Sequence, residues 1–166
     1  MARPGLRPSG ANVVKEDMIE ITEITKDKIN CIRNLWEKLN KMHYEDSIYF
    51  EDHYESFTFE KRIESIVKLN NENLKISIIK DGIKYLGYCI SSIEDKTGEI
   101  DSIYIDDDLR DRGYGKKLVK EHIKWMKNNN CTKIKVAVSY GHDSVKEFYH
   151  KLGFYERLTY YELKEE

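Results

Sequence analysis

Residues 110–118 read Arg-Asp-Arg-Gly-Tyr-Gly-Lys-Lys-Leu, and this glycine-rich stretch separates a strand-like run from a helix-like run. The strand-like run covers residues 100–105, and the helix-like run reaches about Asn128. The first amides of a helix have no acceptor within it, and the helix dipole adds partial positive charge at the same end. A strand that turns through glycines into a helix therefore indicates a site for phosphate oxygens.

The composition is typical of one globular domain with a sizeable core. Of the 166 residues, 40% are hydrophobic and 35% are charged, which is unlike a disordered chain. The net charge of −2 does not suggest the basic surface that nucleic acid needs. The sequence also lacks an apolar run near the roughly 18 residues of a membrane span. We therefore expect neither nucleic acid nor a membrane as a partner.

The cysteines and the first residues bear on the cellular compartment and on where the domain begins. Cys31, Cys89 and Cys131 are odd in number and far apart, so we expect no disulfide framework and no metal site. We interpret them as reduced thiols of a cytoplasmic protein. Residues 1–17 hold both prolines and lack the apolar core of a secretory signal. We interpret them as an expression leader, or alternatively a natural disordered N-terminus, before a single domain over residues 18–166.

Hydrophobic periodicity predicts the order β-α-α-β-β-β-α-β-α-β, an α/β architecture with a mixed sheet. Strands are predicted at residues 18–24, 74–79, 83–93, 99–105, 133–138 and 154–163. Helices are predicted after Thr25 and after Thr58, from the glycine stretch to about residue 128, and over residues 143–152. The weak periodicity of residues 43–57 predicts a loop with one helical turn at most. Asp81-Gly82 indicates a hairpin, and residues 96–98 a second turn.

Two common phosphate-binding patterns do not fit the glycine stretch. A Walker P-loop needs Ser or Thr after its Gly-Lys pair, but Lys117 follows Gly115-Lys116. A dinucleotide fingerprint needs a third glycine where Leu118 stands. A tight strand-to-helix turn without any ligand remains an alternative, and ATP remains a weaker candidate ligand.

The wider context resembles the GNAT acetyltransferases. The run from Ile103 to Leu118 is similar to motif A of that family, Arg/Gln-x-x-Gly-x-Gly/Ala. The order of the predicted elements agrees with the GNAT order from Met18 onward. The resemblance implies the GNAT fold, a mixed, mostly antiparallel sheet of six to seven strands with splayed central strands and about four flanking helices.

A second segment supports the same resemblance. Residues 142–154 look like the later helix of the family, commonly written Asn-x-x-Ala-x-x-x-Tyr-x-x-x-Gly-Phe. Tyr149 and the pair Gly153-Phe154 match this pattern. Val145 replaces the usual Ala, and His142 stands where Asn is usual. The His142 departure puts in doubt the usual contact of this position with the pantetheine arm.

The resemblance implies acetyl-coenzyme A as the donor, with no metal. Its pyrophosphate would accept hydrogen bonds from the amides of residues 112–116, where Gly113 and Gly115 leave room for close approach. The resemblance also implies that the backbone of Ile103 and Ile105 pairs with the pantetheine arm as an added strand. The cofactor-binding candidates are Ile103, Tyr104, Ile105, Arg110, Asp111, Arg112, Gly113, Tyr114, Gly115, Lys116, His142 and Tyr149. For the cations Arg110, Arg112, Lys116 and Lys117, solvated surface charge is the alternative.

Direct attack of the acceptor amine on the thioester requires two proton movements. Tyr149 matches the family tyrosine that acts as general acid toward the departing thiolate; the alternative is a core aromatic. Glu99 lies eleven residues before Arg110, which is the spacing of the base in the histone-acetylating branch. Asp101 shares the face of Glu99 and is a rival base. His142 is a further candidate because imidazole changes charge between pH 5 and 8.

The acceptor is suggested only by charge. Acidic residues gather in two places: Glu45, Asp46, Glu51, Asp52, Glu55 and Glu60 in the region of GNAT substrate entry, and Asp106-Asp107-Asp108 beside the glycine stretch. They favour a cationic amine such as a polyamine, an aminoglycoside or a lysine side chain, or they form a solvated surface. A non-catalytic acyl-CoA-binding module is the alternative to an enzyme. Pairing of the final predicted strand across subunits would make a homodimer.

Overall fold

A computed structural model of the chain describes residues 18–165, so the proposed leader at residues 1–17 lies outside the described residues. Within residues 18–165, five strands form one sheet in the order β1-β2-β3-β4-β5. The strands are β1 (Ile19–Ile24), β2 (Leu74–Asp81), β3 (Lys84–Glu94), β4 (Thr97–Ile105) and β5 (Lys133–Val136). Strands β1 to β4 pair antiparallel, and β5 runs parallel to β4. The α/β class and the mostly antiparallel mixed sheet are therefore confirmed.

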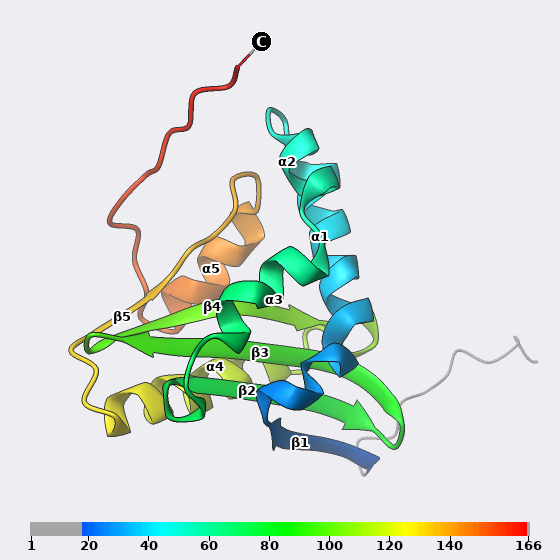
Figure 1. Ribbon diagram of the computed structural model, residues 1–166, viewed down its shortest axis with the longest axis vertical. Coiled ribbons are helices and arrows are strands. Elements are labelled where there is room, and N and C mark those ends of the chain that lie inside the picture. Colours follow the sequence, from blue (N-terminus) through cyan, green and yellow to red (C-terminus); the bar gives the residue numbers. More distant parts are fainter. Residues whose placement is uncertain (1–17, 166) are drawn as a thin grey trace, which may run out of the picture.

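Helices cover both faces of this sheet (Figure 1). The helices are α1 (Arg33–Asp46), α2 (Glu51–Ser56), α3 (Phe59–Val67), α4 (Tyr114–Asn128) and α5 (Asp143–Lys151), with short 3-10 turns η2 (Lys26–Ile32), η3 (Asn71–Asn73) and η4 (Asp107–Leu109). Because strand side chains alternate, Tyr88 and Ile90 pack under α1 and α3, whereas Cys89 and Ile93 face α4 and α5. The sheet thus lies between two hydrophobic cores.

Strands β4 and β5 pair over only part of their length. Their register runs from Thr97 opposite Lys133 to Ile100 opposite Val136, and it stops there. On the other side of β4, Ile90 pairs with Ser102 and Ser91 with Ile100, which leaves Asp101 as an extra, bulged residue. From this bulge to Ile105, the β4 edge on the β5 side has no strand partner in the described chain. The expected splay of the central strands is confirmed.

The prediction of a last strand over residues 154–163 is wrong. Residues 154–163 form no strand, so the described sheet has five strands instead of six to seven. Tyr155, Leu158, Tyr160 and Tyr161 are largely exposed, and the segment runs away from the sheet (Figure 1). Alternation in sequence indicates which residues could share a face of a strand. It does not supply the neighbouring edge that a strand needs for its backbone hydrogen bonds.

Other predicted boundaries also need correction. Residues 43–57 are mostly helical, because α1 continues to Asp46 and α2 follows after a short break. The helix predicted after Thr25 begins as the 3-10 turn η2. The second hairpin turn lies at Asp95-Lys96, both with positive φ, so β4 already begins at Thr97. In contrast, the predicted cap at Thr58 is confirmed, since its side chain accepts a hydrogen bond from the amide of Lys61.

Candidate active site

The glycine stretch forms the turn from the end of β4 into α4. Asp111 and Gly113 both have left-handed backbone, with φ of +60° and +84°. Gly113 is the N-cap residue of α4, and no side chain of the described residues caps the first amides of this helix. Left-handed backbone disfavours residues with a Cβ, so the glycine at position 113 has a local cause. The turn leaves the first amides of α4 available to an anion.

Gly115 has a different environment from Gly113. A Cβ on Gly115 would lie 3.5 Å from the Phe148 ring and 3.6 Å from the Ile105 side chain. The start of α4 therefore contacts both α5 and the end of β4. Among the described residues, no atom lies within 4 Å of a Cβ built on Gly113. Gly113 is thus explained by backbone conformation, and Gly115 by the meeting of three elements.

The cations predicted for the cofactor phosphates differ in their contacts with the rest of the protein. Arg110 lies on the α1 side of the turn, where its Nε donates to the carbonyl of Ile105 at 3.1 Å. Its guanidinium also pairs with Asp107 at 2.7 Å and lies over the ring of Tyr104. Arg112 and Lys116 are exposed beside the start of α4. Arg110 is therefore engaged with the end of β4, whereas Arg112 and Lys116 are closer to the α4 amides in sequence and are solvated.

The unpaired edge of β4 presents backbone groups in a defined pattern. The amide of Asp106 donates to the carbonyl of Leu86 on β3, at 2.8 Å. Because amides alternate in direction along a strand, those of Ile103 and Ile105 point away from β3, toward the unpaired edge. The carbonyl of Asp101 accepts from Arg62, and that of Ile105 from Arg110. Arginine donors thus bracket the edge, and Ile103 lies between them.

Tyr149 lies on α5, facing the sheet. Its side chain is only 6% exposed, between the rings of Phe148 and Phe154 and in the core that contains Cys89. Burial raises the pKa of the Tyr149 hydroxyl above its usual value, so the group is protonated at neutral pH. Burial and the neighbouring Cys89 cause this shift, and no hydrogen bond from residues 18–165 contributes to it. A protonated donor without a protein partner is suited to meet a ligand atom.

The two carboxylates of β4 have different surroundings. Glu99 pairs with Lys135 of β5, with 3.0 Å between its Oε2 and the Lys135 Nζ, in the part where the two strands are still joined. Asp101 is largely buried at the bulge, and burial raises the pKa of its carboxyl. Its Oδ2 has no hydrogen-bond partner within the described residues. Gly98 and Ile100 face α4, so Glu99 and Asp101 share the opposite face, as expected.

His142 is the N-cap residue of α5, and it contacts the end of α1. Its Nε2 lies 2.9 Å from Nδ1 of His43, and its Nδ1 lies 3.3 Å from an Asp46 oxygen. Burial, with the neighbouring His142, lowers the pKa of His43 to about 4. His43 and Asp46 continue the inward stripe of α1 that Trp36 and Leu39 begin. Polar residues at the helical spacing of the Trp36–Leu39 stripe were the available signal for this cluster, and sequence reasoning missed it; here His43 is half-buried and Asp46 is exposed.

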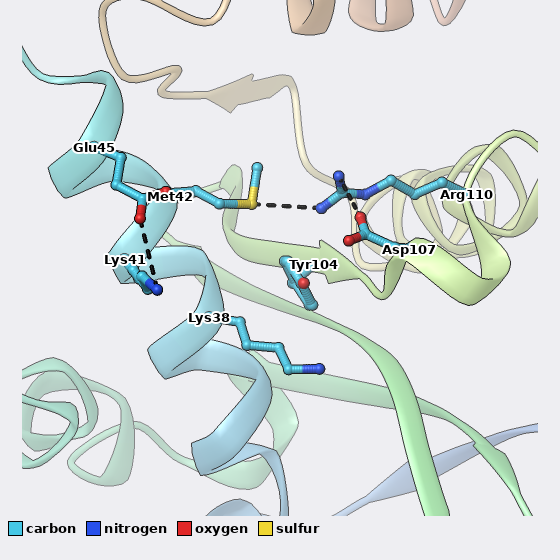
Figure 2. Close-up of a pocket in the computed structure, with 7 residues that line it drawn as sticks. All are labelled: Lys38, Lys41, Met42, Glu45, Tyr104, Asp107 and Arg110. Carbon is cyan, nitrogen blue, oxygen red and sulfur yellow. Dashed lines mark hydrogen bonds and ion pairs between the residues drawn. The ribbon is translucent and has the colours of Figure 1, made fainter.

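A cleft of about 310 Å³ opens between α1 and the end of β4. Figure 2 shows Met42 from α1 reaching toward Arg110 above Tyr104, with Asp107 beside the guanidinium. The cleft is lined by Lys38, Lys41, Met42, Glu45, Tyr104, Asp107 and Arg110. Both acidic and basic side chains therefore line this cleft, and Tyr104 of β4 forms part of its wall.

A larger hollow of about 580 Å³ lies between α1, α2 and the start of α3. Aromatic side chains line it together with carboxylates; they include Trp36, Tyr44, Tyr54, Phe57, Glu37, Glu55 and Glu60. Glu55 and Glu60 belong to the acidic set predicted from sequence, as Glu45 and Asp107 do at the first cleft. Asp52 and Glu51 line neither hollow.

Two general properties of the described residues complete the site. None of the helices in residues 18–165 combines the length and the apolar character that crossing a bilayer requires. Over the same residues, the His, Cys, Asp and Glu side chains form no group of three arranged to hold a metal ion.

Comparison with known proteins gives one sequence match at the family level. The profile of the acetyltransferase (GNAT) family matches residues 35–154, which is most of the chain and includes α1, β4, α4 and α5. No curated protein matches the sequence significantly.

Solved structures share the fold at low sequence identity. A PaiA N-acetyltransferase from Thermoplasma acidophilum, in complex with coenzyme A, is 22% identical, with a TM-score of 0.68 over 85% of this chain and 92% of that one. An aminoglycoside acetyltransferase from an uncultured soil metagenomic sample, in complex with sisomicin, is 17% identical, with a TM-score of 0.64 over 90% and 99%. The ribosomal-protein-S18-alanine N-acetyltransferase of Escherichia coli is 13% identical, with a TM-score of 0.61 over 85% and 80%.

Proposed function

Because the chain belongs to the GNAT family of acetyltransferases, we propose that it is an acetyl-CoA-dependent N-acetyltransferase acting on a primary amine. The observation that carries this proposal is the unpaired edge of β4, which leads directly into the glycine turn and the uncapped start of α4. An extended pantetheine arm and an anionic pyrophosphate need these two features side by side.

The donor binds along β4 and across the turn. The backbone of Ile103 and Ile105 pairs with the pantetheine arm, and the amides of residues 112–116 hold the pyrophosphate. Arg112 and Lys116 add positive charge beside it. The amide of Ile103 or Ile105 also donates to the thioester oxygen as negative charge develops there, which stabilises the tetrahedral intermediate.

The amine attacks the thioester carbon directly. The acceptor first loses one proton from its ammonium group, and the free amine forms the C–N bond. The C–S bond then breaks, and the second nitrogen proton ends on the coenzyme A sulfur, with Tyr149 as the general acid. For the first proton, Glu99, Asp101 and His142 are the acceptors that the sequence suggests. Tyr149 is supported by its protonated hydroxyl in the face of α5 that meets the sheet.

The acceptor is a cationic amine in this proposal. Carboxylates outnumber cations in the larger hollow beside α1, where Glu37, Glu55 and Glu60 favour a polyamine, an aminoglycoside or a lysine side chain. Proteins of the same fold include one in complex with sisomicin and one described as acting on an alanine of a ribosomal protein. The fold therefore accommodates different amines, and the acidic lining of the larger hollow is the specific support here.

Calorimetric titration with acetyl-CoA tests the donor first. We expect binding at micromolar donor, because backbone amides and two cations face one pyrophosphate; absence of binding would contradict the proposal. A panel of spermidine, sisomicin and a lysine peptide, with thiol release as the readout, then tests transfer.

A non-catalytic acyl-CoA-binding module is the second candidate. It is favoured by one observation: His142, at the position of the usual Asn, is held by His43 and Asp46 instead of being free to contact the donor. Donor binding without thiol release from any amine of the panel would support this module over the enzyme.

The cellular location and the oligomeric state follow from other features than the site. We propose a cytoplasmic protein with reduced thiols, in which Cys31, Cys89 and Cys131 are all free. A homodimer would form if the exposed segment containing Tyr155, Tyr160 and Tyr161 paired with a second subunit. Sedimentation at micromolar protein distinguishes the dimer from a monomer.

A further inference from the structure

The end of α1 is fastened to the connection between β5 and α5 by polar contacts. His43 and Asp46 come from the last turns of α1, and His142 comes from this connection, which rises beside α1 in Figure 1. The Tyr54 hydroxyl of α2 donates to Oγ of Ser139 at 3.2 Å. A Cβ on Gly141 would lie only 3.0 Å from the Asp46 carbonyl. The imidazole pair is therefore part of a close contact between two segments far apart in sequence.

Hydrogen-bond chemistry assigns the protons of this cluster. The Asp46 carboxylate has no proton to donate and lies 3.3 Å from Nδ1 of His142 as an ion-pair contact, so a proton on that Nδ1 is the favoured arrangement. In the neutral ring, Nε2 of His142 is then an acceptor, and Nδ1 of His43 must donate to it. This arrangement leaves Nε2 of His43 without a proton. The free nitrogen, Nε2 of His43, is thus a base, and the other end of the chain is the partly exposed carboxylate of Asp46.

We propose that His43 removes the proton from the acceptor ammonium and passes it to His142, which Asp46 stabilises as an imidazolium. This inference rests on the proposed function and names the proton acceptor of that reaction. His43 is the catalytic base, and His142 and Asp46 are positioning residues that act through it.

The position of the cluster fits this role. Met42 lines the cleft above Tyr104, and His43 follows it on the same helix, at the end of α1 that passes the unpaired edge of β4. His142 and Tyr149 are seven residues, or about two helical turns, apart along one side of α5. The base on α1 and the acid on α5 therefore belong to two elements that the His43–His142 contact joins. Glu99, in contrast, is engaged by Lys135.

Each proton is accounted for in the step. The ammonium gives one proton to Nε2 of His43, the Nδ1 proton of His43 moves to Nε2 of His142, and His142 becomes a cation against Asp46. After the C–N bond has formed, the second nitrogen proton reaches the sulfur as the C–S bond breaks. The imidazolium then returns its proton to solvent through His43.

The surroundings of His43 support a neutral base. Burial and the facing His142 lower the pKa of His43 to about 4, whereas Asp46 acts in the opposite direction; from α2 the ring of Tyr54 lies 5.4 Å away. His43 is therefore unprotonated at neutral pH and free to accept. The transferred proton comes to rest on His142, next to the carboxylate.

The pH dependence of kcat/KM tests the proposal, with sisomicin and spermidine as acceptors. His43→Gln should lose about 100-fold near neutral pH. The loss should shrink by about tenfold per pH unit, and vanish at about pH 9, as the acceptor ammonium loses its proton to solvent without help. Added imidazole should partly restore His43→Ala. The control His150→Gln changes an exposed histidine of α5 that pairs with Glu156, and it should keep the wild-type profile.

The outcomes separate this inference from the proposed function. If acetyl-CoA binds and amines are acetylated, but His43→Gln keeps the wild-type pH profile, the inference alone is overturned. If acetyl-CoA does not bind, the proposed function itself fails.

Ring nitrogen spectra give a readout that needs no acceptor. Long-range proton–nitrogen correlation near neutral pH should show His43 and His142 both protonated at Nδ1. A His43 protonated at Nε2 would overturn the proposal irrespective of any activity. Asp46→Asn should change the His142 resonances and spare those of His150.

Discussion

Asp101 lies at the bulge of β4, where β4 and β5 separate. Its carboxyl is largely buried, and the Oδ2 atom has no hydrogen-bond partner within the described chain. The carboxyl has one hydrogen-bond partner, Ser92, so it is only partly compensated for its burial. Such a group destabilises the folded state, and perturbed carboxyls of this kind gather at functional sites. The bulge lies where the unpaired edge of β4 begins, and it thus places a carboxyl in a partly buried, unfavourable position.

Asp101→Asn should stabilise the folded protein at neutral pH by about 1 kcal/mol. Because burial raises the folded pKa above the ordinary 3.8, the folded state of the wild type holds its proton longer than the unfolded state. The wild type therefore loses stability as pH rises through the folded pKa, and the variant does not. Urea unfolding at acidic and neutral pH measures this, with the exposed Glu94→Gln as control. Equal stabilities of variant and wild type at neutral pH would contradict the expectation.

Tyr149→Phe should lower kcat by about 100-fold and spare the affinity for acetyl-CoA. The ring keeps its packing against Phe148 and Phe154, and only the protonated hydroxyl is lost. Thiol release gives kcat, and calorimetry gives the dissociation constant. Tyr155→Phe is the matched control, because that tyrosine is exposed on the segment after α5. An unchanged kcat would remove Tyr149 from the mechanism.

Positions whose residue type follows from the local backbone conformation were predictable from the sequence. Gly113 is needed for a left-handed backbone, and the Gly153 that follows α5 has φ of +87° for the same reason. His43 and His142 were not paired in advance, because they are 99 residues apart and meet only through the fold. The bulge at Asp101 was equally hidden, since it depends on the register with β3.

Among the elements, the turn between β4 and α4 depends most closely on single residues. Its backbone passes through two left-handed residues before α4 begins. This path brings the start of α4 beside the end of β4, since a Cβ on Gly115 would lie within 3.6 Å of the Ile105 and Phe148 side chains. The element can bind an anion only while this backbone path is kept.

Gly113→Ala should lower stability by about 1 kcal/mol and weaken acetyl-CoA binding, because a Cβ disfavours φ near +84°. Gly82→Ala is a matched control. Gly82 also has positive φ, at +56°, and no described atom lies within 4 Å of its Cβ, but it lies in the turn between β2 and β3. Both variants should lose similar stability in urea unfolding, and only Gly113→Ala should lose affinity in calorimetry. Equal affinity in both would argue against phosphate binding at this turn.

Elements were predicted well where an apolar stripe is continuous. The inward stripe of α1 is apolar through Leu39 and Met42, but it continues with His43 and Asp46, and the helix was predicted to end too early. The opposite error occurred at residues 154–163, where alternation was present without a partner edge. In both cases tertiary contacts, or their absence, decided the outcome over local pattern.

At the scale of the whole molecule, one buried histidine joins α4 to the middle of the sheet. His122 is fully buried, with Nδ1 2.7 Å from Oγ of Ser91 on β3 and Nε2 3.0 Å from Oγ of Ser77 on β2. Burial lowers the pKa of His122 to about 3. Burial and the neighbouring His142 lower the pKa of His43, on α1, to about 4. Both rings are therefore neutral in the folded state at neutral pH.

These two histidines should make the folded protein sensitive to acid. The unfolded chain binds a proton at each ring below about pH 6.5, and the folded chain does not, so stability is full above that pH and falls as pH decreases toward 4. Each ring should cost about 1.4 kcal/mol per pH unit in this window. Urea unfolding at several pH values measures the slope. His122→Gln and His43→Gln should each remove about half of it, whereas the exposed His150→Gln should leave it unchanged. A slope that neither buried substitution alters would show that other groups control acid unfolding.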